Sequence, residues 1–425
     1  MEWVKLHDVG FGECVVVGGS HGEILMVDCG TLRPRLDDQR LFREDVPVIA
    51  SQYANASERS FLLSHFHKDH YCGLPLLLRG DPQYFDRIYV PCCPVDRKGV
   101  PLLMELAIFI ESFVTGPGAE TVRMNGANLR FFREICTLAT TETIYTLSAG
   151  DLLEFDDEMY EVLWPPKENY PFSPELIGLV DEANRILSTS RDSCADAFLV
   201  LKDQLCAAYI RCMDAFAYET TADQQERQDC VEDLFHLLDE LNDLLPYLHT
   251  LRVAQRVSEL LKDRSKVLAV GREINGSSLI LSSERLLLTG DATPETMGRI
   301  APMLHDSYEV VKAPHHGTQS CWWDGFTDLG ITHLLISNGR VRGGGKIARA
   351  YGSLNALHHC TGVNHCACYE ETGRCCNEGL YCPLCVPETA DPTRCRIRGC
   401  PIYVGSFWEL HPCRCTEKRL DWDAV

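Results

Sequence analysis

Four residues of the types that bind transition metals lie close together in the segment Phe61–His70. His65, His67, Asp69 and His70 directly follow the apolar run Phe61–Leu63. Because residues two apart on an extended chain point the same way, His65 and His67 can hold one ion together. A turn after them lets Asp69 and His70 face a second ion, and imidazole and carboxylate both suit zinc and its neighbours. A histidine-rich surface loop is the alternative, but the hydrophobic strand that leads into the cluster favours a metal site.

Three further apolar segments end in residues of the same kind. They are Ile24–Val27 before Asp28, Arg285–Leu288 before Asp291, and Val310–Pro314 before His315 and His316. An aspartate after a strand is common, so each segment alone is weak evidence. Counted with the strand before the histidine cluster, four such segments in this order along the chain form a distinctive pattern.

The H-x-H-x-D-H pattern and these strand contexts resemble the metallo-β-lactamase superfamily. The resemblance implies an α/β fold, the αββα sandwich, with two divalent ions (Zn²⁺ or Mn²⁺) at the active site. The first ion would be held by His65, His67 and Asp291, and the second by Asp69, His70, Asp291 and His316. Asp28 would lie behind the ligands and fix the tautomer of one histidine.

His315 has two possible roles that the sequence does not separate. It is either a ligand in place of His316 or the acid that protonates the leaving oxygen. The expected catalytic residues are therefore Asp69, His315 and Asp28.

Other segments narrow the resemblance to a branch of the superfamily. Asp8–Cys14, Asn275–Leu279 and Lys312–Thr318 resemble the hydrolase domain of ComEC-type competence proteins, and similar patterns occur in choline-binding phosphodiesterases. The resemblance covers about residues 1–165 and 267–340. The segment Val162–Pro166 departs from the wider superfamily, because it lacks the usual third-motif histidine for the first ion. Candidate substrate contacts are Lys312, Asn275, Ser278, Thr318, Arg340 and Arg342.

Composition limits the class of protein and its partners. The chain has 425 residues and a formal net charge of −21, and 45% of its residues are hydrophobic. Such acidity argues against sequence-blind binding along a nucleic-acid strand, although metal ions can neutralise phosphate at a site. The start of the chain does not resemble a signal peptide, and no apolar run is long enough for a membrane span. We therefore expect a cytoplasmic protein without membrane contact.

The spacing of apolar residues divides the chain into parts. We expect residues 1–171 to form the first half of the sandwich, with Leu129–Ile135 among its alternating segments, and residues 267–357 to form the second half. Between them, residues 172–266 contain little glycine and show helical spacing, for example at Leu234, Leu238 and Leu241. This helical insertion is either a packing or dimerisation element, which could bind a protein partner, or a cap over substrate entry.

Half of the 22 cysteines crowd into the last part of the chain, residues 358–425, and the others are scattered as small buried residues. In a reducing compartment the crowded cysteines predict structural Zn²⁺, with a disulfide-bonded tail as the alternative. Arginines between them could contact nucleic acid or a partner protein. The predicted zinc ligands are Cys360, Cys366, Cys368, Cys375, Cys376, Cys382, Cys385, Cys395, Cys400, Cys413 and Cys415.

Three functions compete on this evidence. The first is a binuclear metal-dependent phosphodiesterase or nuclease acting on single-stranded DNA or RNA. The second is a hydrolase of a small substrate, such as a cyclic nucleotide, another phosphodiester, a lactone or a thioester. The third is a regulatory protein that binds partners through its zinc-rich tail. The complete set of ligand residues weighs against the third, because a decayed enzyme would be expected to lose ligands.

Overall fold

The computed structural model describes residues 1–33, 35–36, 41–114, 128–339, 347–361 and 401–403. The cysteines from Cys366 to Cys415 that are predicted to bind zinc, together with Arg340 and Arg342, lie outside these residues. Cys360 ends a strand, but its side chain is also outside the description.

Two mixed β-sheets and a set of helices make up the described chain. The first sheet has the strand order β14-β1-β2-β3-β4-β5-β6, and the second has the order β13-β12-β11-β10-β9-β8-β7. In the first sheet the strands are β1 (Trp3–Leu6), β2 (Val15–Gly18), β3 (Ile24–Val27), β4 (Arg59–Leu62), β5 (Arg87–Pro91), β6 (Ile144–Leu147) and β14 (Pro401–Tyr403). In the second they are β7 (Leu152–Phe155), β8 (Glu158–Trp164), β9 (Ile280–Ser282), β10 (Leu286–Leu288), β11 (Ser307–Lys312), β12 (Gly330–Ile336) and β13 (Leu357–Cys360).

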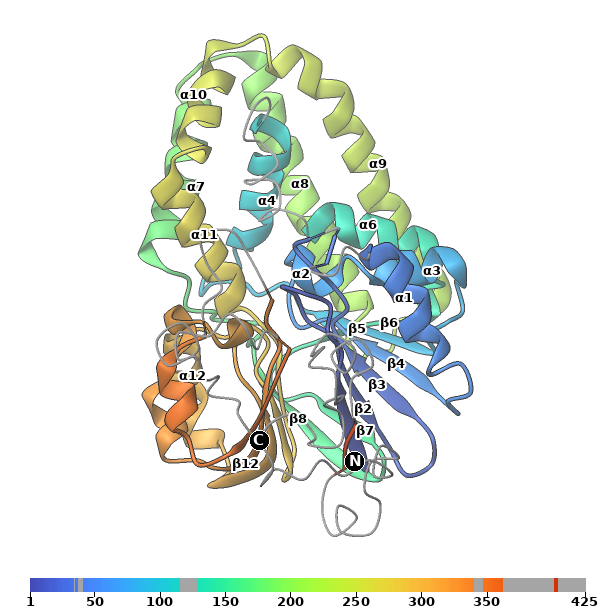
Figure 1. Ribbon diagram of the computed structural model, residues 1–425. Coiled ribbons are helices and arrows are strands. Elements are labelled where there is room, and N and C mark those ends of the chain that lie inside the picture. The colour runs from blue at the N-terminus through green and yellow to red at the C-terminus, as the bar shows by residue number, and fades with distance from the viewer. Residues whose placement is uncertain (34, 37–40, 115–127, 340–346, 362–400, 404–425) are drawn as a thin grey trace, which may run out of the picture. The chain divides into compact units, whose positions relative to one another are not determined.

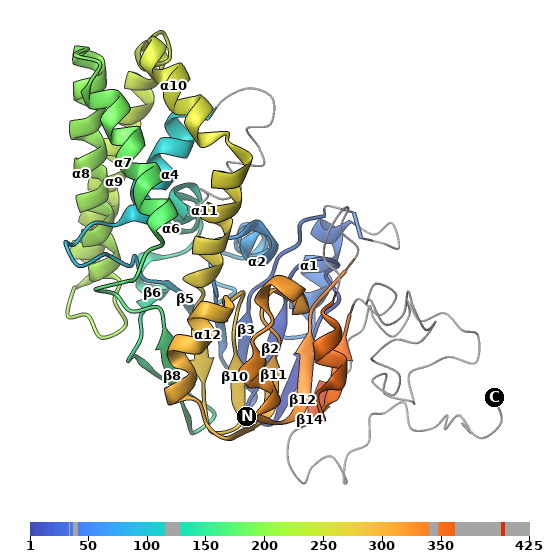
Figure 2. The same ribbon diagram turned by 90° about the vertical axis from the view of Figure 1, so that its left-hand side faces the viewer.

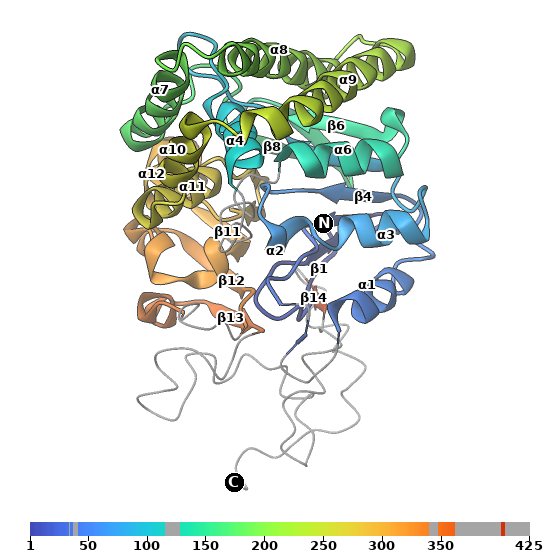
Figure 3. The same ribbon diagram turned by 90° about the horizontal axis from the view of Figure 1, so that it is seen from above.

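The chain divides into two compact units. The first comprises residues 1–88, 152–164 and 278–425, and the second comprises residues 89–151 and 165–277. In the first unit, helices α1 (Phe42–Ser51) and α3 (Leu74–Gly80) flank one sheet, and α12 (Pro294–Ile300) flanks the other. Figures 2 and 3 show the strands of the two sheets between these helices. The first unit is therefore layered helix, sheet, sheet, helix.

Parallel pairing explains why polar side chains gather at one end of each sheet. β3 pairs with β4 in parallel, and β11 lies between β10 and β12, parallel to both. The strands are almost fully buried, as their Val, Ile and Leu content predicts for parallel sheets covered on both faces. Because the carboxyl ends of parallel strands lie at the same edge of a sheet, the residues that follow β3 and β4 are neighbours, as are those that follow β10, β11 and β12.

The second unit is mainly helical. Its helices are α4 (Leu102–Phe113), α6 (Asn128–Leu138), α7 (Pro174–Ser188), α8 (Ser193–Ala215), α9 (Gln224–Leu248), α10 (Arg252–Leu261) and α11 (Arg264–Gly276). Figure 1 shows α4 and α7–α10 side by side as a bundle. Ser173, Asp192 and Asp223 cap the first turns of α7, α8 and α9 by accepting hydrogen bonds from backbone N–H groups. Inside the bundle, the ring of Phe198 packs 5.0 Å from that of Phe113.

Two sequence expectations about these elements were wrong. The segment Leu129–Ile135 is part of helix α6, with Leu129, Phe132 and Ile135 buried at helical spacing. Residues 267–276, expected to open the second half of the sandwich, continue the helical segment as α11. There Val270 and Ile274 are buried four residues apart while Leu268 is exposed, so one face of a helix accounts for the apolar pattern.

The described part of the chain contains no helix that is both long and apolar enough to cross a membrane. The cysteines between Cys14 and Cys321 are all free thiols, and many of them are buried.

Candidate metal centre

The candidate site lies in the first unit, where strand ends and their loops converge. His65, His67 and Asp291 form one group, and Asp69, His70 and His316 form a second; in each, one ligand atom per residue lies within 4.8 Å of the others. The loop after β4 supplies His65 and His67, and it continues into the short helix α2 (Lys68–Tyr71), which carries Asp69 and His70. Asp291 follows β10 and His316 follows β11. The structure thus brings together the residues that the sequence proposed as metal ligands.

The distances between donor atoms suit bound ions. His65 Nε2 lies 3.0 Å from His67 Nδ1, and His316 Nε2 lies 3.2 Å from an oxygen of Asp69. Metal–ligand bonds of about 2.0–2.2 Å place neighbouring ligand atoms around one ion at about 3.0–3.6 Å from each other. The spacing of these atoms therefore matches the edges of a coordination polyhedron.

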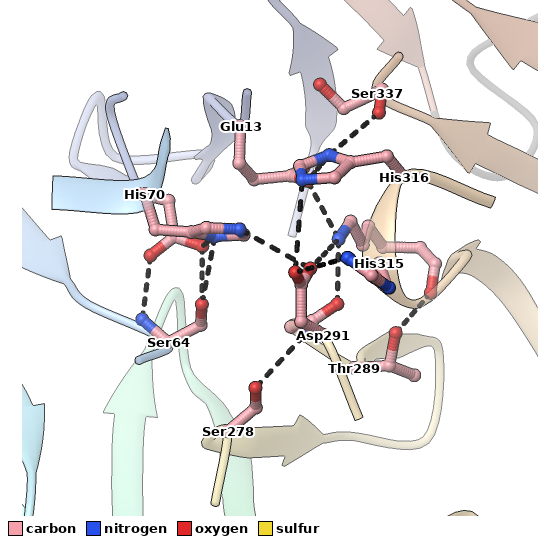
Figure 4. A network of polar contacts seen from close by, with 12 residues as sticks. Glu13, Ser64, His70, Ser278, Thr289, Asp291, His315, His316 and Ser337 are labelled. Carbon is pink, nitrogen blue, oxygen red and sulfur yellow. Dashed lines mark hydrogen bonds and ion pairs between the residues drawn. The ribbon is translucent and has the colours of Figure 1, made fainter. Parts of the chain in front are cut away.

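Asp291 is placed to serve both groups (Figure 4). Its Oδ1 lies 3.4 Å from His70 Nε2, and its Oδ2 lies 3.7 Å from His65 Nε2 and 3.9 Å from His316 Nε2. Among the described residues, Asp291 Oδ1 and His70 Nε2 are buried atoms without a hydrogen-bond partner. Unpaired buried polar atoms cost free energy, and a shared cation would satisfy them. The donor set therefore fits a pair of divalent ions.

Asp28 and Ser64 orient two of the histidines from behind. Asp28 Oδ2 lies 2.8 Å from His70 Nδ1 and accepts the Ser64 hydroxyl at 2.6 Å. The Ser64 oxygen lies 3.0 Å from His65 Nδ1 and can accept its proton. Both histidines then carry the proton on Nδ1 and direct Nε2 towards Asp291. This is the contact that the sequence assigned to Asp28, whereas Ser64 was missed although it directly precedes His65.

The two adjacent histidines after β11 have different surroundings. His316 is fully buried, and its Nδ1 donates to the backbone carbonyl of Ser337 at 3.0 Å, which leaves Nε2 for a metal. His315 has 28% of its side chain exposed and turns its Nδ1 towards Thr318 Oγ1 at 3.0 Å. Its Nε2 lies 3.8 Å from Asp291 Oδ2. The geometry places His316 among the donors and His315 beside them.

Left-handed backbone helps to aim these side chains. Asp28, His315 and His316 have φ angles of 58°, 47° and 58°, which are uncommon for residues other than glycine. Such conformations persist where the surrounding structure enforces them, and they concentrate at functional sites.

Burial and neighbouring charges set the protonation of the site. Burial lowers the pKa of His65 well below its ordinary value and that of His67 to about 4, so both are neutral near pH 7, as metal ligands must be. Burial alone would lower the pKa of His70, but the carboxylates of Asp291 and Asp28 raise it well above its usual value, so this ring is protonated in the metal-free protein and a metal would displace the proton on Nε2. Burial alone would raise the pKa of Asp69, but the hydrogen bond with His316 and the charge that His70 carries without metal outweigh it and lower the pKa to about 2. Asp69 is therefore a carboxylate at neutral pH.

The residues that were expected to contact a substrate have different surroundings in the structure. Lys312 is buried and its Nζ is 2.7 Å from Glu13 Oε2, so it does not present a free ammonium group to a substrate. The hydroxyl oxygen of Ser278 accepts a hydrogen bond from the backbone N–H of Asp291 at 3.0 Å. Asn275 is buried in α11 of the second unit, and Thr318 contacts His315. Glu13, the partner of Lys312, lies in the segment Asp8–Cys14 and is not among the expected site residues.

Comparisons of this chain with protein-family models, with curated proteins and with solved structures find no match. The site and the fold of the first unit are thus the basis for any statement about function.

Proposed function

We propose that this protein is a binuclear metal-dependent hydrolase of the metallo-β-lactamase type that acts on phosphodiesters. The observation that carries the proposal is the convergence of two His/Asp groups on the one carboxylate of Asp291, with unpaired buried donor atoms between them. The layered first unit and the resemblance of the H-x-H-x-D-H motif support the same reading.

In this proposal each donor has a defined task. His65 and His67 would hold one ion, Asp69, His70 and His316 would hold the other, and Asp291 would contribute its carboxylate to both. Bound there, divalent ions supply Lewis-acid activation of water and neutralise the charge of a phosphate. Asp28 and Ser64 keep the protons of His70 and His65 on Nδ1, so that the Nε2 lone pairs stay directed at the ions.

His315 is the residue that we assign to the leaving group. Its side chain is 28% exposed, whereas those of His65, His70 and His316 are buried, and its Nε2 lies 3.8 Å from Asp291 Oδ2. A proton held at this Nε2 can pass to the leaving oxygen, while Thr318 holds the opposite ring nitrogen.

The choice of a phosphodiester rests on charge. A divalent pair among buried carboxylates suits an anionic substrate, whose charge would otherwise be repelled by a chain of net charge −21. Nucleic acid and small diesters share this chemistry, and the arginines proposed to hold a strand, Arg340 and Arg342, lie outside the described residues.

A metal titration followed by a substrate panel tests the proposal. The metal-free protein is titrated with Zn²⁺ or Mn²⁺ and then assayed on bis(p-nitrophenyl) phosphate, single- and double-stranded DNA, RNA, a lactone and a thioester. We expect metal-dependent cleavage of the diesters, and its loss in H67A and D69A. The control is H236A, since His236 is a largely exposed residue of α9.

The outcomes separate the competing functions. Cleavage of the small diester alone identifies a small-substrate enzyme, and cleavage of the lactone or thioester alone overturns the choice of phosphodiester. A protein that binds no metal beyond the tail zinc contradicts the whole proposal. Zinc that resists a weak chelator in H67A as well as in the wild type would belong to the cysteine-rich tail, whose metal sites stay a prediction.

A further inference from the structure

A buried ion pair lies directly behind the candidate metal centre. Lys312 Nζ is 2.7 Å from Glu13 Oε2, and the two residues are 2% and 1% exposed. Neither belongs to the two His/Asp groups. Burying a charge pair is costly, and such a pair often contributes little net stability, so its position beside the metal centre calls for a further role.

Lys312 holds the turn that carries Asp291. Its Nζ donates to the carbonyl oxygen of Gly290 at 2.8 Å and lies 3.8 Å from Asp291 Oδ1. Gly290 has a φ of +51°, and a Cβ there would meet the side chain of Ser278 at 2.8 Å. The turn is tightly enclosed, so its carbonyl contact with Lys312 helps to fix where the Asp291 carboxylate points.

Glu13 holds the segment that carries Asp69. Its backbone N–H donates to the carbonyl of Asp69 at 2.9 Å, and its backbone carbonyl accepts from Gly30 N at 2.9 Å. Its carboxylate Oε2 is also 3.7 Å from Nδ1 of His316. Through one ion pair, Glu13 and Lys312 therefore connect the Asp69 loop with the turn of Asp291 and with His316.

Resting on the function proposed above, we propose that Glu13 and Lys312 are positioning residues of the metal centre. The pair holds Asp291 in place relative to Asp69 and His316, so that the shared carboxylate is already aimed when the ions bind. The pair does not touch the substrate, and it acts through Asp291.

Simple electrostatics and the positioning role predict opposite effects of removing Lys312 on metal affinity. A cation 3.8 Å from Asp291 repels divalent ions, so its loss would strengthen metal binding if charge alone mattered. If positioning dominates, its loss weakens binding, because partners of ligand residues typically account for about 10–100-fold in metal affinity. The sign of the change separates the two roles.

The test uses K312M, E13Q and the double variant E13Q/K312M in the full chain. Metal affinity is measured by competition with a chromogenic chelator, and the stability of the metal-free protein by thermal unfolding. The control is K202M, because Lys202 is also buried and ion-paired, with Glu105 at 2.8 Å, but belongs to α8 of the second unit.

We expect K312M and the double variant to bind metal about 10–100-fold more weakly than the wild type, and K202M to bind it normally. The double variant leaves no uncompensated buried charge, so its metal-free stability should exceed that of E13Q while its metal affinity stays low. Unchanged or tighter binding in both K312M and the double variant would overturn the positioning role. Failure of the wild type to bind metal would instead refute the proposed function.

Discussion

Asp28 directly follows β3 and His70 lies in α2, and their side chains meet at 2.8 Å between Oδ2 and Nδ1 in a fully buried setting. The same carboxylate accepts hydrogen bonds from the backbone N–H and the hydroxyl of Ser64. One side chain therefore controls the ring orientation of His70 directly and that of His65 through Ser64.

This arrangement predicts the effect of D28N. Asparagine tolerates the left-handed backbone at position 28, but its NH₂ group cannot accept the Nδ1 proton of His70. We expect metal affinity to fall about 10–100-fold, as measured by chelator competition. D151N is the matched control, since Asp151 accepts from the N–H and hydroxyl of Ser148 in the same way. Equal losses in both variants would contradict a specific role for Asp28.

Substitutions of the two adjacent histidines, His315 and His316, should affect metal content and activity differently. H316Q removes a buried donor, so we expect the protein to lose one equivalent of active-site metal together with its activity. H315Q should keep its metal content but lose about 10²–10⁴-fold in kcat, the usual range for a general acid. Elemental analysis and steady-state kinetics on a chromogenic diester check both. Metal loss in H315Q would reverse the assignment.

Acid should destabilise the metal-free protein partly through His7. This residue is buried, its Nε2 lies 2.5 Å from the hydroxyl of Tyr53, and burial lowers its pKa from 6.5 to about 3. Between these values the unfolded chain binds a proton at His7 that the folded chain does not. The contribution of His7 to the free energy of unfolding is therefore complete above pH 6.5 and is lost as the pH falls towards 3. The loss is about 1.4 kcal/mol per pH unit at most.

The H7Q variant isolates this contribution. Glutamine can still form a hydrogen bond with Tyr53 but does not titrate. The free energy of unfolding of H7Q should therefore depend less steeply on pH between 6.5 and 4.5 than that of the wild type. Urea unfolding in the presence of a chelator measures the difference. H236Q, at a largely exposed site, should follow the wild type. Parallel pH curves for H7Q and the wild type would refute the assignment.

Gly30 should not tolerate a side chain. A Cβ at this position would lie 2.4 Å from the backbone carbon of Asp69 and 2.5 Å from the backbone nitrogen of His70. We expect G30A to destabilise the fold by about 1–3 kcal/mol and to weaken metal binding, because the ligand loop must move. G80A is the control, since nothing lies within 4 Å of a Cβ there. Thermal unfolding and metal titration measure both effects, and wild-type behaviour of G30A would show that the loop can shift freely.

The donors could be predicted from sequence because each follows an apolar strand. His65, His67, Asp69 and His70 lie within six residues of one another. Asp291 belongs to a Gly-Asp pair and His316 to a His-His pair, and each pair comes after an apolar strand. The pairing of Glu13 with Lys312 could not be predicted in this way, because it joins a loop residue before β2 to the last residue of β11, and no local pattern relates the two. The difference between His315 and His316 could not be predicted either, because it lies in their burial and hydrogen-bond partners, which side-chain types do not reveal.

The errors in secondary structure have a similar origin. The apolar residues of Leu129–Ile135 are compatible with both a strand and a helix, and the burial of Leu129, Phe132 and Ile135 on one face decides for α6. The segment Val267–Val270, expected to open the second half of the sandwich, is short and apolar like a strand but continues a helix.

The donors come from both sheets of the first unit: the loop after β4 in one, and the segments after β10 and β11 in the other. Ions held by them would cross-link strands that are more than 200 positions apart in the chain, much as a disulfide does. Neither group is complete until Asp291 or His316 has joined the loop of His65–His70, so tight binding must follow the docking of one sheet on the other. Saturating metal should therefore slow the opening of the sandwich much more than it speeds its formation.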